Sequence, residues 1–145
     1  MDYLYEVIEA IKPVLKKYGF KKNRLNWISE KEECYKIFNI QKSIYGKNIY
    51  LNIGIQIKCL IKNESKLIYK CHIQKRIDDL IGKEYLDFEN NNEINRIDKF
   101  ISLLENDPYN FFSMKGNKND IIKFANSNNK MMIKGKAEIY LSQNG

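Results

Sequence analysis

The sequence predicts a two-layer α+β fold, in which an antiparallel meander of about four to five strands is covered on one face by helices. Residues 49–57 alternate between apolar and polar side chains, as a half-buried strand does. Three further segments read as strands joined by short connections: 24–29, 34–43 and 67–77. Two other segments carry apolar residues at helical spacing: 2–18 and a helix near residues 92–105. Together they predict a single domain, 1–145.

The N-terminal helix carries an apolar stripe that runs from Leu4 to Tyr18. Asp2 is suited to the N-cap, and Gly19 is suited to the position after the helix ends. Pro13 lies inside this segment and removes one backbone hydrogen bond. We therefore expect the helix to be kinked near Glu9, or split.

The centre of the predicted sheet is a hairpin of residues 34–43 and 48–57, joined by the short connection 44–47. One face of this hairpin is apolar and predicts the core: Phe38, Ile40, Ile49, Leu51, Ile53, Ile55 and Ile57. In the strand 67–77, alternation places Cys71 and Ile73 on one side and His72 on the other. Gly54, in mid-strand, indicates a bulge or a close approach to the backbone.

The opposite face of the sheet is polar and is the candidate binding surface. Its proposed contact residues are Asn39, Gln41, Lys42, Ser43, Asn52, His72, Gln74 and Arg76. Amide side chains do not titrate, so this composition favours recognition by hydrogen bonds over proton-transfer chemistry. The alternative interpretation is the solvated side of an ordinary sheet.

The net charge of +7 lies entirely in residues 1–72, because residues 73–145 are neutral. A basic patch is expected around the end of the first helix: Lys16, Lys17, Lys21, Lys22 and Arg24. Such a patch is compatible with a nucleic-acid partner. It is equally compatible with a lysine-rich surface and with cations that stabilise the end of a helix dipole.

No catalytic constellation is recognisable, so the sequence predicts a protein that is not an enzyme, with no cofactor and no metal site. His72 is the single histidine, and the neighbouring Cys71 must point to the opposite face of a strand. Asp78 and Asp79 are expected to begin a helix. Cys34, Cys59 and Cys71 are expected to be buried free thiols in a reducing cytoplasm. No apolar run is long enough for a membrane span.

The last part of the chain is less regular. Asn92 is suited to cap the helix near 92–105, which Asp107 and Pro108 should end. Asp120 is suited to cap a short helix that reaches Ala125. Residues 131–141 fit either a strand end or a short helix.

Four pieces of sequence, in this order and spacing, resemble a family of bacterial domains of unknown function, DUF4304: Y-G-F-K-K (18–22), N-I-Q-K-S (39–43), L-N-I-G-I (51–55) and C-H-I-Q-K-R-I (71–77). The resemblance covers roughly residues 4–105. It supports the fold and implies no established activity. Where the family has a Trp-rich segment, this chain has Tyr85, Leu86, Asp87 and Phe88.

The function expected from these observations is that of a small cytoplasmic, non-catalytic module that binds a protein partner through the polar face, as an immunity or accessory protein would. The alternative is a nucleic-acid-binding protein that uses the basic N-terminal half.

Overall fold

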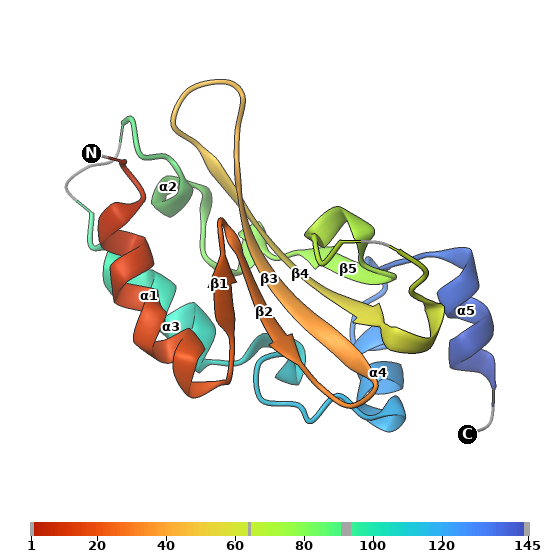
Figure 1. The fold of residues 1–145 in the computed structure, drawn as a ribbon. Coiled ribbons are helices and arrows are strands. Elements are labelled where there is room, and N and C mark those ends of the chain that lie inside the picture. The colour runs from red at the N-terminus through yellow and green to blue at the C-terminus, as the bar shows by residue number, and fades with distance from the viewer. Residues whose placement is uncertain (1, 64, 91–93, 144–145) are drawn as a thin grey trace.

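A computed structural model describes residues 2–63, 65–90 and 94–143 and confirms the α+β fold class (Figure 1). The sheet is an antiparallel meander in which spatial order follows chain order. Its six strands are β1 (Lys21–Asn23), β2 (Asn26–Glu30), β3 (Cys34–Lys42), β4 (Ile49–Ile57), β5 (Ile73–Arg76) and β6 (Met132–Ile133). The helices are α1 (Tyr5–Lys17), α2 (Lys83–Leu86), α3 (Arg96–Glu105), α4 (Lys118–Ala125) and α5 (Gly135–Ser142). Four short 3₁₀ turns are η1 (Lys58–Leu60), η2 (Ile68–Lys70), η3 (Asp78–Leu80) and η4 (Pro108–Asn110).

One face of the sheet, which we call the core face, is apolar because alternate residues of every long strand are apolar. Trp27 and Phe38 face each other across β2 and β3, with ring centroids 5.6 Å apart. Helices α1 and α3 lie side by side against this layer (Figure 1). Phe111 and Phe112, which follow η4, complete the core with edge-on ring contacts. The sheet therefore needs the C-terminal third of the chain to cover its core face.

Helix α1 is not split by Pro13 but continues through it, from Tyr5 to Lys17. Pro13 lies on the exposed side of the helix, where the ring meets solvent. Asp2 does not occupy the N-cap position itself; its Oδ1 accepts the N–H of Leu4 at 3.0 Å. The C-terminal expectation is confirmed, since Gly19 has φ of 90° and its N–H donates to the carbonyl of Lys16.

The predicted strand 67–77 is shorter than expected, because only Ile73–Arg76 pairs with β4. The described residues before it, 58–63 and 65–71, form a crossing segment, which passes over the second face of the sheet. Ile68 packs against the backbone of Gly54 on that face, and Cys71 does the same. Cys71 thus lies on the opposite side of the sheet from Ile73. The paired strand is short because the apolar side chains that precede it pack over the face of the sheet instead of extending its edge.

The C-terminal elements settle the ambiguous region. Residues 131–141 contain both the short strand β6 and most of α5. The expectation that Asp120 caps the short helix is wrong, because Asp120 lies inside its first turn. The N-cap of α4 is Asn117, whose Oδ1 accepts the N–H of Asp120, while Asp120 Oδ2 accepts the N–H of Gly116. Asn95 caps α3 through the N–H of Asp98. The expected cap, Asn92, lies outside the described residues.

The two edges of the sheet are short. β1 has three residues and β6 has two, so each edge offers few unpaired backbone groups. Among the described helices, none combines the length and the apolar character that crossing a membrane requires.

Candidate functional site

The second face of the sheet, the polar face, is organised by a row of amide side chains. Asn26, Asn39 and Asn52 lie directly opposite one another on β2, β3 and β4, and Arg76 continues the row on β5. Asn52 Nδ2 donates to Asn39 Oδ1 at 3.1 Å, and Asn39 Nδ2 donates to Asn26 Oδ1 at 3.1 Å. Asn52 Nδ2 also donates to Gln41 Oε1 at 3.3 Å. The amides therefore form one hydrogen-bonded chain across three strands.

The predicted contact residues do not form one uniform surface. Asn39, Asn52 and His72 are buried, Ser43 and Gln74 are half-buried, and Gln41, Lys42 and Arg76 are exposed. Lys42 leaves the polar face, since strand alternation turns it away from Gln41. Its Nζ meets Asp2 Oδ2 at 3.1 Å. Ser43 Oγ accepts the N–H of Tyr45 and shapes the turn.

The side chain of His72 is buried and has a structural role. Its side chain is 1% exposed, and Nδ1 accepts the backbone N–H of Ile57 at 2.8 Å. Its own backbone joins β4 to the residue that follows β6, because its N–H donates to the carbonyl of Ile55 and its carbonyl accepts the N–H of Lys134. His72 thus closes the ends of two strand pairings.

Gly54 lets the chain itself approach the sheet. A Cβ built at this position would lie 2.8 Å from Cys71 Sγ and 2.9 Å from Ile68 Cδ1. The close approach expected from a glycine in mid-strand is therefore made by the crossing segment. Beside it, Gln56 is fully buried and its Nε2 donates to the carbonyl of Ser65 at 2.8 Å.

The connection between β3 and β4 extends beyond the rest of the sheet (Figure 1). We call residues 43–48 the hairpin tip. Two large apolar side chains are exposed there, Ile44 at 87% and Tyr45 at 79%. The sequence predicts only a short connection here, although an adjacent Ile and Tyr in a turn already indicate an exposed apolar patch.

A groove of about 780 Å³ lies beside the hairpin tip. Ser43, Tyr45, Asn48, Ile49, Tyr50, Asp78, Asp79, Gly82, Lys83 and Leu86 line it. The carboxylate of Asp78 is fixed in position, because its Oδ1 accepts the N–H of Leu51 at 2.6 Å. Burial raises the pKa of its carboxyl above the ordinary value, against the effect of that hydrogen bond. Asp78 and Asp79 begin η3, as the sequence predicted for a helical start.

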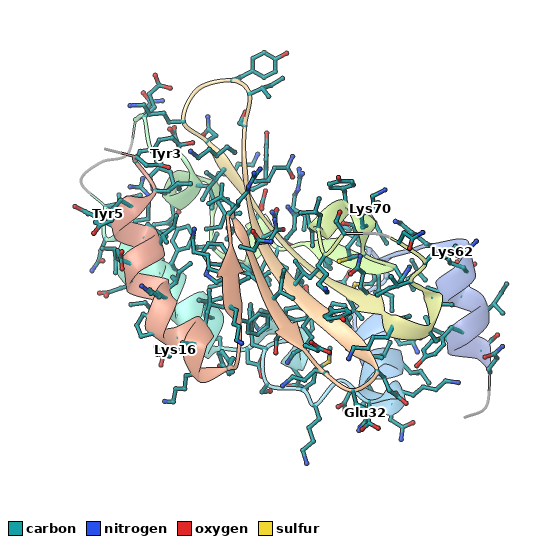
Figure 2. All side chains as sticks on the ribbon, in the orientation of Figure 1. Tyr3, Tyr5, Lys16, Glu32, Lys62 and Lys70 are labelled. Carbon is teal, nitrogen blue, oxygen red and sulfur yellow. The ribbon has the colours of Figure 1, made fainter. Side chains whose placement is uncertain are left out.

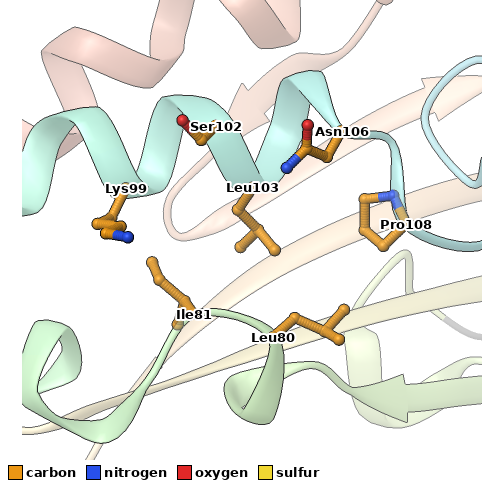
Figure 3. A pocket seen from close by; sticks show the side chains of 7 residues that line it. All are labelled: Leu80, Ile81, Lys99, Ser102, Leu103, Asn106 and Pro108. Atoms are coloured by element: carbon orange, nitrogen blue, oxygen red, sulfur yellow. The ribbon is translucent and has the colours of Figure 1, made fainter.

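A second depression, of about 290 Å³, lies between α3 and η3 (Figure 3). Figure 3 shows Leu103 of α3 facing Ile81 and Leu80, with Lys99 beside Ile81. Among the described residues that line it, Lys99 is the only titratable group. This depression therefore offers packing surface and little chemistry.

Lys36 is a buried polar residue that sequence reasoning missed. It lies on the core face of β3, fully buried, and its Nζ donates to the carbonyls of Phe112 at 2.7 Å and Met114 at 2.8 Å. The rings of Phe20 and Phe111 lie 5.5 and 6.0 Å from Nζ. Burial lowers the pKa of this ammonium to about 8. The signal was available, because Lys36 interrupts an otherwise apolar alternation.

The thiols fall into two groups. Cys34 and Cys71 are buried as expected, whereas Cys59 is exposed. Burial raises the pKa of Cys34 to about 11 and also raises that of Cys71. The described residues contain no group of three or more His, Cys, Asp or Glu side chains that could hold a metal ion.

The fold and these surfaces define a small α+β protein with a polar sheet face, a crossing segment and an exposed hairpin tip. The family model for the domain of unknown function DUF4304 matches residues 11–113, well over half of the chain. The chain therefore belongs to the DUF4304 family, as the four sequence pieces indicated. Neither the curated proteins nor the solved structures contain a match to it.

Proposed function

We propose that this chain is a non-catalytic protein-binding module that contacts its partner through the hairpin tip and the groove beside it. The observation that carries this proposal is the pair Ile44 and Tyr45, which expose 87% and 79% of their surface at the end of a projecting hairpin. Aromatic and aliphatic side chains that enter a partner's pocket supply most of the binding energy of typical interfaces. An apolar pair at such a position is suited to that role.

The groove continues this surface towards the polar face. Tyr45 and Tyr50 both line it, and the guanidinium of Arg76 lies 4.2 Å from the ring centroid of Tyr50. Exposed Gln41 is opposite Tyr50 in the register of β3 and β4. The exposed part of the predicted site thus adjoins the hairpin tip, and an immunity or accessory role is one form that such binding takes.

The sheet edges argue against partner binding by strand addition. This mode needs a long, accessible edge strand, and here the edges have three and two residues. A partner that uses loops and side chains fits this architecture better.

The non-catalytic part of the proposal is supported by the state of the reactive side chains. The imidazole of His72 is buried and accepts a backbone hydrogen bond. Cys34 and Cys71 are buried with raised thiol pKa values, which disfavours the nucleophilic thiolate.

Photo-crosslinking in the native host tests the proposal. A photoreactive amino acid at position 45 is expected to give a discrete crosslinked species, which mass spectrometry identifies. The matched control is position 5, where Tyr5 is 49% exposed on α1, outside the hairpin tip and the groove. Equal crosslinking to the same protein from both positions contradicts the assigned surface.

The identified partner is then purified and titrated by calorimetry. Ile44→Ser and Tyr45→Ser are each expected to weaken the affinity about tenfold or more, as removal of a central apolar anchor does. Tyr5→Ser is the control and should leave the affinity unchanged. Because Ile44 and Tyr45 are exposed, all three variants should fold with unchanged stability. Unchanged affinity of both tip variants overturns the proposal.

A further inference from the structure

The crossing segment carries a second concentration of positive charge that the N-terminal patch does not include. Lys58, Lys62, Lys66 and Lys70 recur every fourth residue, with Glu64 as the single acid between residues 58 and 70. Figure 2 shows Lys62 and Lys70 on this segment, on the side of the molecule away from Lys16 at the end of α1. The two basic clusters therefore differ in position as well as in sequence.

Aromatic rings lie among these lysines. The Nζ atoms of Lys58 and Lys66 lie 5.0 and 4.7 Å from the ring centroid of Tyr35 on β3. Lys70 Nζ lies 5.4 Å from the ring of Tyr69, which is 61% exposed. Cations interleaved with aromatic side chains are typical of surfaces that bind single-stranded nucleic acid, where phosphates meet the charges and bases stack on the rings.

Part of the N-terminal patch joins this surface. Lys21 is paired with Ile28 on the edge of the sheet, next to β2. Glu30, at the end of β2, has its pKa lowered by the hydrogen bond from Lys58 and by the charges of Lys58, Lys66 and Lys21. Glu30 thus binds Lys58 directly, at 2.8 Å, and lies within the electrostatic influence of Lys21 and Lys66, which come from two distant parts of the sequence.

A small pocket lies between these charges and the amide row. Its volume is about 340 Å³, and its lining is Asn26, Asn39, Gln41, Leu67, Ile68 and Tyr69. Gln41 Oε1 accepts from Asn52 and Asn26 Oδ1 accepts from Asn39. Within the described part of the chain, the NH₂ groups of Gln41 and Asn26 donate to no protein atom. The pocket thus combines an aromatic wall with amide donors, as a site for the edge of a base requires.

We propose that the polar face and the crossing segment bind single-stranded nucleic acid, with a base against Tyr69 and the amide pocket and with phosphates on Lys21, Lys66 and Lys70. The small number of arginines does not oppose this, because phosphate contacts need only point charges. An acidic protein segment would use the lysines but would leave the pocket and Tyr69 without a role. This site is separate from the hairpin tip and does not depend on a protein partner.

Fluorescence anisotropy with labelled 15-nucleotide oligo(U) and oligo(dT) tests the proposal on the full chain. The three proposed phosphate contacts on a single strand predict a salt slope of about −2. Affinity should therefore fall about 20-fold between 50 and 200 mM salt. A duplex of equal length should bind more weakly at the same salt concentration, because its bases cannot reach Tyr69.

Variants locate the site. Lys66→Gln with Lys70→Gln should reduce the magnitude of the slope by about 1.4, whereas Lys16→Gln with Lys17→Gln, the matched control on α1, should leave it unchanged. Tyr69→Ala should weaken binding about fivefold or more at an unchanged slope. Tyr5→Ala, which removes an exposed ring on α1, should leave the affinity unchanged. These side chains are exposed or half-buried, and circular dichroism verifies that each variant is folded.

Three results overturn the proposal. The first is no binding of either oligonucleotide at 20 mM salt. The second is a larger loss of slope in the Lys16 and Lys17 variant than in the Lys66 and Lys70 variant, which would move the site to α1. The third is that polyglutamate competes as well as oligo(U) while Tyr69→Ala binds normally, which would assign the surface to an acidic protein.

Discussion

Asn52 Nδ2 donates to Asn39 Oδ1 at 3.1 Å across the β3 and β4 pair, and both side chains are more than nine-tenths buried. Each of these two amides also has a further partner, since Asn39 donates to Asn26 and to the carbonyl of Leu25, and Asn52 donates to Gln41. Buried amides without partners are costly, so these mutual hydrogen bonds stabilise the row. The amide row of the polar face is thus a hydrogen-bonded part of the fold and not only a solvated surface.

Removing the middle amide should destabilise the protein. Asn39→Ala leaves Asn26 and Asn52 without their shared partner, and the free energy of unfolding should fall by about 1–3 kcal/mol. Urea unfolding followed by circular dichroism measures this. Asn23→Ala, in the same row but exposed on the edge strand, is the control and should change stability by less than about 0.5 kcal/mol. Equal effects of the two substitutions would show that the row contributes nothing.

Lys36 should make stability depend on alkaline pH. Its pKa is about 8 in the folded protein against an ordinary 10.5, because burial opposes the charge. Between these values the unfolded chain binds more protons, so stability rises with pH over this range and is reduced below about pH 8. Relative to Lys36→Met, the wild type should gain up to about 3 kcal/mol between pH 7.5 and 10.5.

Urea unfolding of both proteins across this pH range measures the difference. The comparison cancels the titration of shared groups that Lys36 does not influence. Cys34, whose thiol pKa the charge of Lys36 lowers against the effect of burial, is replaced by Ala in both proteins. Parallel pH profiles of the two proteins would mean that Lys36 keeps its ordinary pKa in the folded state.

Gly54 should not accept a side chain. A Cβ there would lie under 3 Å from both Cys71 and Ile68, so the crossing segment must move, at a cost of about 1–3 kcal/mol. Thermal unfolding of Gly54→Ala measures the loss. At Gly135, where a Cβ meets nothing within 4 Å, the same substitution should be neutral or slightly stabilising. A Gly54→Ala protein as stable as Gly135→Ala would refute close packing of the crossing segment.

His72 should matter for stability at neutral pH. His72→Leu leaves the backbone N–H of Ile57 without its 2.8 Å acceptor in a buried position, which should cost about 1–3 kcal/mol. His72→Asn keeps a short acceptor and should recover part of the loss. Chemical unfolding of the three proteins at pH 7 gives the comparison. Wild-type stability of His72→Leu would remove the structural role and reopen a functional one.

The sequence predicted the parts of the fold that depend on local pattern. Alternation over 49–57 identified β4 and its buried side, helical spacing identified α1 and α3, and Gly19 marked the end of α1. Prediction from sequence was less successful where a segment packs over the sheet instead of pairing with its edge. Residues 67–72 alternate like a strand, yet Ile68 and Cys71 pack over Gly54 and leave only Ile73–Arg76 to pair. Burial against a distant strand outweighed local preference there.

By itself, the sequence determined an α+β protein with an antiparallel meander covered by helices, its apolar core and its membership of the DUF4304 family. Only the tertiary structure decided which polar residues are available to a partner. Lys36 finds its two acceptors 76 and 78 residues away. Asn39 and His72 are buried, while Ile44, Tyr45 and Tyr69 are exposed. The physical reason is that periodicity fixes which way a side chain points along its own strand, whereas exposure depends on which distant segment lies above it.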